Sequence, residues 1–134
     1  MKIIHRFASS EVLDASNEFP AVLVTGARQV GKTTLLREAA EDKRKFVSLD
    51  SLPVRDLARR DPSAFLKVYS PPVIIDEIQY APELLPHIKA IIDENPDLCG
   101  QFWLSGSQQF HLMKNREQPK VSSELLYDNC LDVA

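Results

Sequence analysis

The chain contains too little of several things to belong to some large classes of protein. Only two of its 134 residues are cysteines, Cys99 and Cys130, and they lie far apart in no motif. Neither a disulfide framework nor a cysteine-based metal site is therefore expected. No apolar run approaches the roughly 20 residues that span a bilayer. Residues 1–12 lack the continuous apolar segment of a signal peptide, so we expect a cytoplasmic protein without a membrane partner.

The chain also lacks a large excess of charge of either sign. Its formal net charge is −3, so no global positive field attracts nucleic acid or anionic lipid. Two basic clusters, residues 43–45 and 59–60, are short and mixed with acidic residues, which is typical of solvated helix ends. Nucleic acid is therefore not indicated as a partner. The length and the hydrophobic fraction of 44% are those of one ordinary globular domain.

Short apolar runs alternate with longer amphipathic segments. Each run is continuous and rich in large or branched residues, which is typical of a strand buried on both faces of a parallel sheet. The predicted strands are residues 21–25, 46–50, 73–77 and 101–107. Helices are expected between them, with a short last one at residues 108–114. The order β-α-β-α-α-β-α-β-α predicts an α/β fold with helices on both faces of the sheet.

Prolines and polar residues predict where several helices begin and end. Pro53 is expected to open one short helix, and Asp61 to cap the next one before Pro62. Asn95, which precedes a proline, is expected to end the helix before the fourth strand.

A glycine-containing segment between the first strand and the first helix fits the Walker A pattern, Gly26-x-x-x-x-Gly31-Lys32-Thr33. Its backbone N–H groups can form an anion nest, and the helix that follows begins facing the same phosphates. Lys32 brings a positive charge to the β- and γ-phosphates, and the Thr33 hydroxyl can ligate Mg²⁺. The predicted phosphate-binding residues are Gly26, Ala27, Arg28, Gln29, Val30, Gly31, Lys32, Thr33 and Thr34.

Two adjacent acidic residues, Asp76 and Glu77, end the third apolar run. Mg²⁺ takes one or two carboxylates and keeps several waters, so Asp76 and Thr33 are the predicted metal ligands. Glu77 is then placed to orient and deprotonate an attacking water, and it is the predicted catalytic base, with Lys32 as a second catalytic residue. The other interpretation, a solvated acidic turn, is disfavoured by the Walker A segment upstream.

A polar turn, residues 105–108, follows the fourth strand. A side chain here can contact the γ-phosphate or the attacking water. Ser105, Ser107 and Gln108 are alternatives for this role, with Ser107 as the catalytic candidate, while a helix-capping serine is the other interpretation. Gln79, two residues beyond the predicted base, is expected to couple to this turn.

Taken together, three segments resemble the AAA-type P-loop ATPases of prokaryotes that are usually described only as ATP-binding proteins. The segments are VTGARQVGKTTLL, VIIDEIQYAPELLPHIKAIIDEN and FWLSGSQQFHLMK, within about residues 19–114. The resemblance implies a three-layer α/β/α P-loop fold of the additional-strand type, with ATP and Mg²⁺ as ligands. It also implies phosphate binding by residues 26–34, metal binding by Thr33 and Asp76, a base at Glu77 and a sensor in the turn at residues 105–108.

The sequence departs from the family pattern after Lys114. The family continues with a stretch that ends in Gly-Arg, a fifth strand, a helical lid and a large C-terminal domain of uncharacterised function. No arginine follows Arg116 here, so we expect the last strand and the lid to be missing. We therefore divide the chain into an incomplete ATPase core, residues 1–114, and a divergent tail, residues 115–134. The first strand is then expected at an unprotected sheet edge.

The leading hypothesis is ATP binding with slow Mg²⁺-dependent hydrolysis. An arginine finger adds about 10³–10⁵ in rate, and the sequence indicates none in this chain. The alternative is a nucleotide-binding interaction module, or a truncated remnant, without turnover. A phosphotransferase would need an acceptor pocket and a GTPase an Asn-Lys-x-Asp element, and neither is evident. The sequence does not identify a protein partner.

Overall fold

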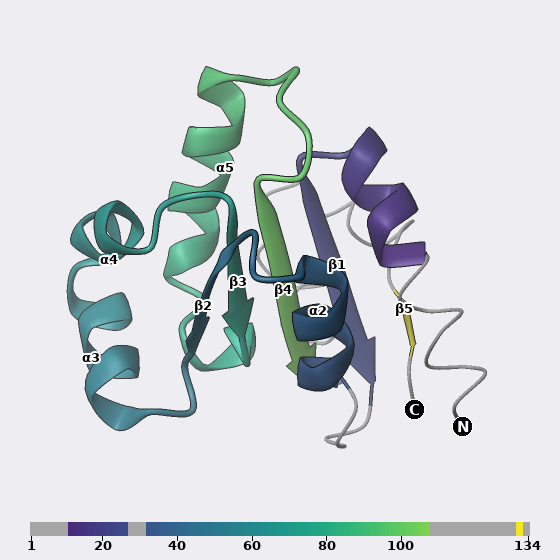
Figure 1. Ribbon diagram of the computed structural model, residues 1–134. Helices are drawn as coiled ribbons and strands as arrows, with labels where there is room; N and C mark the ends of the chain where they lie inside the picture. The colour runs from purple at the N-terminus through teal and green to yellow at the C-terminus, as the bar shows by residue number, and fades with distance from the viewer. Residues whose placement is uncertain (1–10, 27–31, 108–130, 133–134) are drawn as a thin grey trace.

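The structure, a computed structural model, describes residues 11–26, 32–107 and 131–132. Its strands form one parallel sheet in the order β2-β3-β4-β1-β5 (Figure 1). The strands are β1 Ala21–Gly26, β2 Lys45–Ser48, β3 Val73–Asp76, β4 Phe102–Ser107 and β5 Leu131–Asp132. The helices are one at residues 11–18, α2 Lys32–Ala40, α3 Leu52–Arg60, α4 Pro62–Val68, the 3₁₀ turn η1 Ile78–Tyr80 and α5 Leu84–Glu94.

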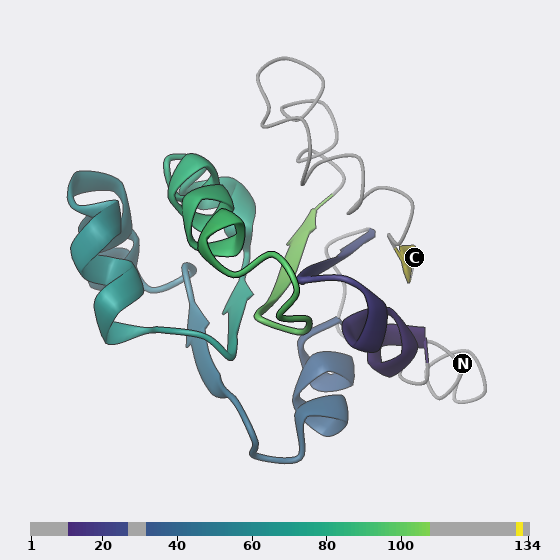
Figure 2. The same cartoon turned by 90° about the horizontal axis from the view of Figure 1, so that it is seen from above.

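Helices cover both faces of the sheet, as predicted. Seen from above, α3, α4 and α5 lie on one side, and α2 with the helix at residues 11–18 lies on the other (Figure 2). Alternate residues of each strand enter the two apolar layers. Leu23, Ile75 and Leu104 pack with α3, α4 and α5, while Val22, Ile74 and Trp103 pack with the other two helices. The sheet is thus buried on both faces, which explains its continuous apolar runs.

The strand order confirms the additional-strand type of P-loop fold. β4 lies between β1 and β3, so the strand before the Walker A segment and the strand that ends in Asp76 do not pair with each other. Ser105, which comes from the inserted strand, therefore lies between the two predicted motifs. This position matters for the site described below.

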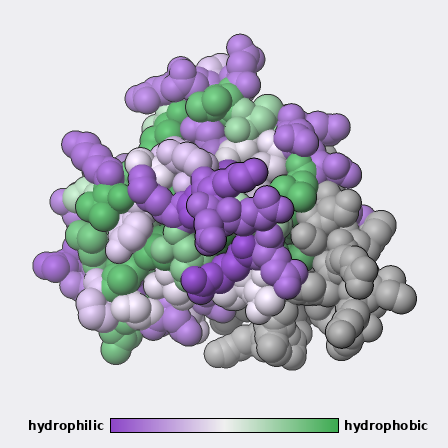
Figure 3. All heavy atoms as spheres, in the orientation of Figure 1, coloured by the Kyte–Doolittle hydropathy of each residue, from purple (hydrophilic) through white to green (hydrophobic). Residues whose placement is uncertain are grey.

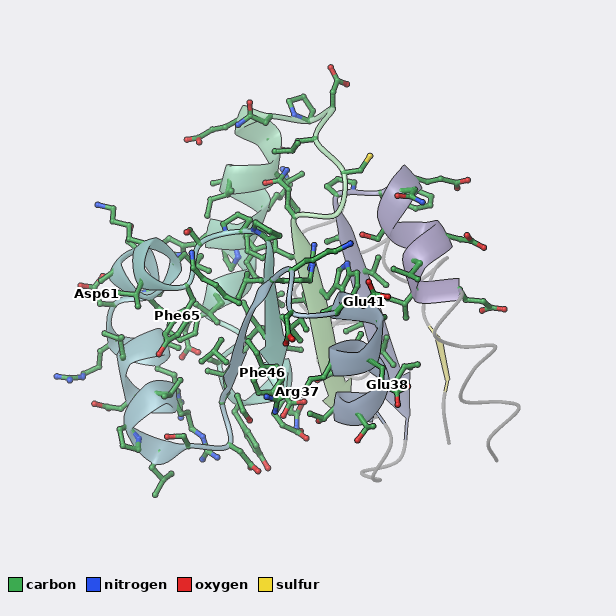
Figure 4. All side chains as sticks on the ribbon, viewed as in Figure 1. Arg37, Glu38, Glu41, Phe46, Asp61 and Phe65 are labelled. Carbon is green, nitrogen blue, oxygen red and sulfur yellow. The ribbon has the colours of Figure 1, made fainter. Side chains whose placement is uncertain are left out.

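Local signals in the sequence correctly placed the helix ends around Asp61. A proline opens α3, and the Asp61 N–H bonds the Leu57 carbonyl as that helix ends. The Asp61 carboxylate then accepts from the Ala64 N–H at 3.1 Å, which caps α4. Figure 4 shows Asp61 at this start and Phe65 one turn further along the helix. α5 ends at Glu94 with Asn95 as its C-cap, also as expected.

One helix was not predicted, and the largest difference among the predicted strands is at the end of the second one. The helix at residues 11–18 was not expected, because only Val12 and Ala15 give it a buried face. The second strand ends at Ser48 and not at residue 50, because the Ser48 hydroxyl accepts from the Asp50 N–H at 3.1 Å and starts a turn. The helix predicted at residues 108–114 lies outside the described residues.

The edge of the sheet beside β1 is a correction to the sequence analysis. We expected no strand there, but β5 pairs in parallel with β1, opposite Val24 and Thr25. The open backbone groups of an edge strand favour pairing with any extended segment, and residues 131–133 read Leu-Asp-Val, with apolar side chains on either side of the aspartate. The expectation of an unprotected edge is therefore wrong along these two residues.

Two cation–π contacts join the layers near β2 and β4. The Arg37 guanidinium of α2 lies 4.3 Å from the centre of the Phe46 ring of β2, and Figure 4 shows the two side chains next to each other.

The face that includes α2 is mostly hydrophilic across its middle in Figure 3, with smaller apolar areas at its left. Within the described residues, no helix is long and apolar enough to cross a bilayer.

The amino ends of the strands are joined by what we call the amino-end cluster, Ser16, Arg44, Gly100 and Trp103. Arg44 donates from Nη1 to the Val73 carbonyl at 3.3 Å and from Nη2 to the Gly100 carbonyl, and its guanidinium lies 4.0 Å from the centre of the Trp103 ring. The Trp103 indole N–H donates to Ser16 Oγ at 2.9 Å, which fastens the N-terminal helix. Burial lowers the pKa of Arg44 to about 10, so the side chain stays charged at neutral pH.

Candidate functional site

The carboxyl ends of the strands bring the predicted site residues together at one edge of the sheet. The arrowheads of β1 to β4 all point to this edge (Figure 1). The register places Ser48 opposite Asp76 and Gly26 opposite Ser107. Helix α2, which begins at Lys32, follows β1 at the same edge. Parallel α/β sheets bind their ligands at such an edge.

Asp76 is the centre of this edge, and its carboxylate accepts three hydroxyl hydrogen bonds. Thr33 Oγ1 of α2 donates to Oδ1 at 3.0 Å, and Ser105 Oγ of β4 donates to the same oxygen at 2.6 Å. Ser48 Oγ of β2 donates to Oδ2 at 2.9 Å. We call these four residues the Asp76 cluster. Both carboxylate oxygens are thereby held from three different elements.

Burial explains why the Asp76 carboxylate needs these partners. The residue is only 7% exposed, and a buried carboxylate without hydrogen bonds would be strongly destabilising. Hydrogen bonds to a charged group contribute about 1.5–3 kcal/mol each. They also fix the orientation of the carboxylate. The contact between Asp76 and Thr33 joins the two residues that the sequence predicts as metal ligands.

Glu77 leaves the strand in an unusual backbone conformation. Its φ of 61° and ψ of 51° are left-handed, which costs a residue with a side chain about 1–2 kcal/mol. The Glu77 N–H donates to Ser105 Oγ at 3.2 Å, and the Tyr80 N–H donates to the Glu77 carbonyl at 3.1 Å. The side chain is half-buried, and its Oε1 accepts from Gln79 Nε2 at 2.6 Å. Such strained positions are frequent at functional sites.

Ser105 contacts both predicted acidic residues. Its hydroxyl donates to Asp76 and accepts from the Glu77 N–H, and the residue is fully buried inside β4. Because Ser105 lies within the strand, it does not cap a helix. Ser107 pairs with Gly26 through the backbone register, but its side chain and all of Gln108 lie outside the described residues. The catalytic assignment of Ser107 therefore stays a prediction, and Ser105 is the alternative that the structure brings to the site.

Part of the Walker A segment cannot be compared with the prediction. Residues 27–31 and the Lys32 side chain lie outside the described residues. Gly26 ends β1, and Lys32, Thr33 and Thr34 form the first turn of α2. A strand before the segment and a helix after it agree with the position that a phosphate loop requires.

Ser48 is a site residue that the sequence analysis missed. A serine at the end of a strand has no local signal, and its role depends on the register that places it opposite Asp76. A second unpredicted feature lies beside it. Arg55 of α3 donates from Nε to the Leu49 carbonyl at 3.0 Å, and its guanidinium lies 3.9 Å from the centre of the Tyr80 ring. α3 thereby contacts the turn that follows Glu77.

Similarity to known proteins extends over most of the chain. Residues 18–125 match a protein family described as AAA domain. Two uncharacterized proteins, from Mycobacterium bovis and Mycobacterium tuberculosis, are each 34% identical over 107 residues. Each match covers 80% of the chain but only 24% of the relative, so the chain spans about a quarter of the length of these relatives.

A solved structure shows the same fold at low sequence identity. The ORC2 protein of Aeropyrum pernix, whose structure is of ADPNP-ADP complexes, has a TM-score of 0.51 and is 18% identical. The likeness covers 98% of the chain and 46% of that protein. At this identity the comparison bears on the fold alone.

Proposed function

The chain belongs to the AAA domain family, and from that premise we propose that it binds ATP with Mg²⁺ and hydrolyses it slowly. The observation that carries the proposal is the 3.0 Å contact between Thr33 and Asp76. These side chains come from the helix after the Walker A segment and from the end of β3, 43 positions apart in sequence. In a P-loop site a hydroxyl and a carboxylate in these two places share one magnesium ion.

The donor chemistry at this edge fits Mg²⁺. Thr33, Asp76 and the serines of the Asp76 cluster offer hard oxygen atoms, with one carboxylate at their centre. Mg²⁺ prefers oxygen ligands, needs only one or two carboxylates and keeps several waters. When bound, the ion neutralises negative charge on the phosphate oxygens. Thr33 and Asp76 are the residues that would hold it.

The other residues have separate roles in this proposal. The backbone of residues 26–34 and the Lys32 ammonium bind the phosphates of ATP. Glu77 accepts a proton from the water that attacks the terminal phosphate, and general-base catalysis of this kind contributes about 10²–10⁴ in rate. Ser105 links Asp76 to the Glu77 backbone, so it is placed to couple metal binding to the position of the base.

Membership of the AAA domain family supports a nucleotide as the ligand. The resemblance to prokaryotic AAA-type ATPases implies a large C-terminal domain that contacts the partner. The greater length of the mycobacterial relatives agrees with that proposal.

The test measures binding and turnover separately. ATP at about 100 times its Kd should stabilise the fold by about 2.7 kcal/mol, seen as a rise in Tm that needs Mg²⁺. Lys32→Ala should abolish the shift, while Lys43→Ala, a matched change at an exposed lysine, should retain it. No shift with ATP, ADP or GTP would contradict nucleotide binding altogether.

Phosphate release then distinguishes an ATPase from a binding module. The wild type should release phosphate slowly, and Glu77→Gln should reduce the rate by about 10²-fold or more while ATP still binds. Glu94→Gln, an exposed glutamate at the end of α5, is the matched control. Equal background rates in the wild type and Glu77→Gln, with ATP bound in both, would show a nucleotide-binding module without turnover.

A further inference from the structure

The carboxylate of Glu77 is held by a side chain from its own turn. Gln79 Nε2 donates to Glu77 Oε1 at 2.6 Å, and both residues are half-buried. A carboxylate only accepts, so the amide nitrogen of Gln79 must face it. We propose that Gln79 is a positioning residue, which fixes the direction of the Glu77 carboxylate for proton transfer. The inference rests on the proposed hydrolysis and adds a residue to it.

The backbone of Glu77 is already fixed, which makes the side chain the only part left to position. Its N–H is bound by Ser105 Oγ, and its carbonyl by the Tyr80 N–H. Ile78, the next residue, is fully buried in the core. Three rotatable bonds still separate the fixed Cα of Glu77 from its carboxylate, and restricting such a side chain costs up to about 2 kcal/mol. The Gln79 hydrogen bond restricts those bonds before any substrate binds.

The turn that includes Gln79 is itself braced by the rest of the fold. Tyr80 lies under the Arg55 guanidinium at 3.9 Å, and Arg55 is tied to the Leu49 carbonyl of the segment after β2. The Ala81 N–H bonds the Ile78 carbonyl and closes the 3₁₀ turn. Gln79 therefore belongs to a turn that is held in place by these contacts. Its hydrogen bond fixes the Glu77 carboxylate relative to that turn.

The two acidic residues of the site differ in how their oxygens are used. Both oxygens of Asp76 accept hydroxyl hydrogen bonds, which suits a carboxylate that is held in one orientation. Glu77 has a donor at Oε1, and in the part of the chain that the structure describes Oε2 accepts no hydrogen bond. The amide of Gln79 is neutral, so it orients the carboxylate without adding a positive charge. A positive charge beside the carboxylate would make Glu77 a weaker base. Oε2 thus stays available to accept a proton from water.

The first test is a substitution that removes the donor and keeps the length of the side chain. Gln79→Met should lower kcat for ATP hydrolysis about tenfold, equivalent to the loss of one hydrogen bond to a charged group. The KM and the Kd for ATP should change less than about twofold, since the proposed role of Gln79 is to direct the base and not to bind the phosphates. Lys89→Met is the matched control. It removes a donor 2.7 Å from the Asp93 carboxylate on α5 and should leave kcat unchanged.

A double-substitution cycle shows whether Gln79 acts through Glu77. In a Glu77→Gln background, Gln79→Met should have no further effect on the residual rate. A full additional tenfold loss there would overturn the proposal, because Gln79 would then act on something other than the base. Unchanged kcat in the single variant would overturn it as well.

A measurement without nucleotide separates this inference from the proposed hydrolysis. In the ¹⁵N–¹H spectrum of the wild type, the side-chain amide signal of Gln79 should be shifted by its carboxylate acceptor, and Glu77→Ala should change the position of that signal. If the signal is insensitive to Glu77→Ala, the positioning role is wrong. A wild type that binds ATP without phosphate release would contradict hydrolysis alone, and the amide signal would still decide the contact.

Discussion

Ser48 shows how much of the candidate site depends on one small side chain. Its hydroxyl donates to Asp76 Oδ2 at 2.9 Å and accepts from the Asp50 N–H at 3.1 Å. Ser48→Ala leaves a buried carboxylate oxygen and a backbone donor without these partners. We expect the free energy of unfolding in urea to fall by about 1–2 kcal/mol. Ser70→Ala, which removes an exposed hydroxyl bonded to Lys45, should cost less than about 0.5 kcal/mol.

Ser48→Ala should also weaken the Mg²⁺-dependent binding of ATP. Asp76 would lose one of the contacts that orient it, and supporting residues of this kind typically contribute 10- to 100-fold to metal affinity. Isothermal titration with and without Mg²⁺ measures the effect. A lower stability with full affinity would mean that Thr33 and Ser105 alone suffice to orient the carboxylate.

The left-handed backbone of Glu77 reverses a common rule about glycine. At an ordinary helix position glycine is about 1 kcal/mol less stable than alanine. At φ 61° the side chain is the source of strain, so Glu77→Gly should be more stable than Glu77→Ala by about 1 kcal/mol. Thermal or urea unfolding of both variants measures this. Lys89→Gly and Lys89→Ala, in the middle of α5, should show the opposite order, and the same order at both positions would contradict the strain.

The sequence could predict those site residues whose chemistry is local. Thr33, Asp76 and Glu77 stand in recognisable positions next to a strand end, so their proximity follows from the parallel order of the strands. The roles of Ser48 and Ser105 come from contacts across strands, over sequence separations of 28 and 29 residues. The contact of Ser105 with Asp76 depends on how β4 lies beside β3, and a short polar turn does not determine this.

At the scale of elements, Asp61 connects two helices through a single residue. Its N–H ends α3 at the Leu57 carbonyl, and its carboxylate begins α4 at the Ala64 N–H. Asp61→Ala should lower the free energy of unfolding by about 1 kcal/mol in urea. Asp61→Asn should retain most of the stabilisation that the cap contributes, because an amide oxygen can still accept the hydrogen bond. Asp56→Ala is the control on α3. It removes an exposed ion pair with Arg60 that is worth at most about 0.5 kcal/mol.

The affinity for ATP should be unchanged in Asp61→Ala. The two helices pack on the face of the sheet away from α2, and Arg55, which contacts the turn after Glu77, lies six residues before the cap. A loss of affinity would mean that the α3–α4 junction helps to place the turn after Glu77.

Elements were predictable where the cause of their structure is short-range or repeated along the chain. β1, β3 and β4 are buried on both faces, and Asp61 and the prolines act on their nearest neighbours in sequence. The helix at residues 11–18 has two buried residues, too few for a recognisable period. The pairing of β5 is set by β1, more than 100 residues away, and its two residues have no strand signal of their own.

At the scale of the whole molecule, the amino ends and the carboxyl ends of the strands hold two different clusters of residues. The amino-end cluster joins the N-terminal helix, the segment before β2 and the starts of β3 and β4, and it includes no predicted site residue. The carboxyl ends form the Asp76 cluster. β3 connects the two, from Val73, whose carbonyl accepts from Arg44, to Asp76. At about 3.3 Å per residue its ends are about 10 Å apart.

This separation predicts that substitutions at the two ends act independently. Arg44→Ala removes the donors to two carbonyls and the cation that stacks on Trp103, and it should cost about 2–4 kcal/mol in urea unfolding. Arg44→Lys should lower the free energy of unfolding by an intermediate amount, because lysine keeps the positive charge but not the planar guanidinium with its several donors. Combined with Ser48→Ala, the losses should add within about 0.5 kcal/mol, as sites 7–10 Å or more apart usually do. A larger coupling energy would mean that β3 transmits strain between the ends of the sheet, so that nucleotide binding and the anchoring of the N-terminal helix are linked.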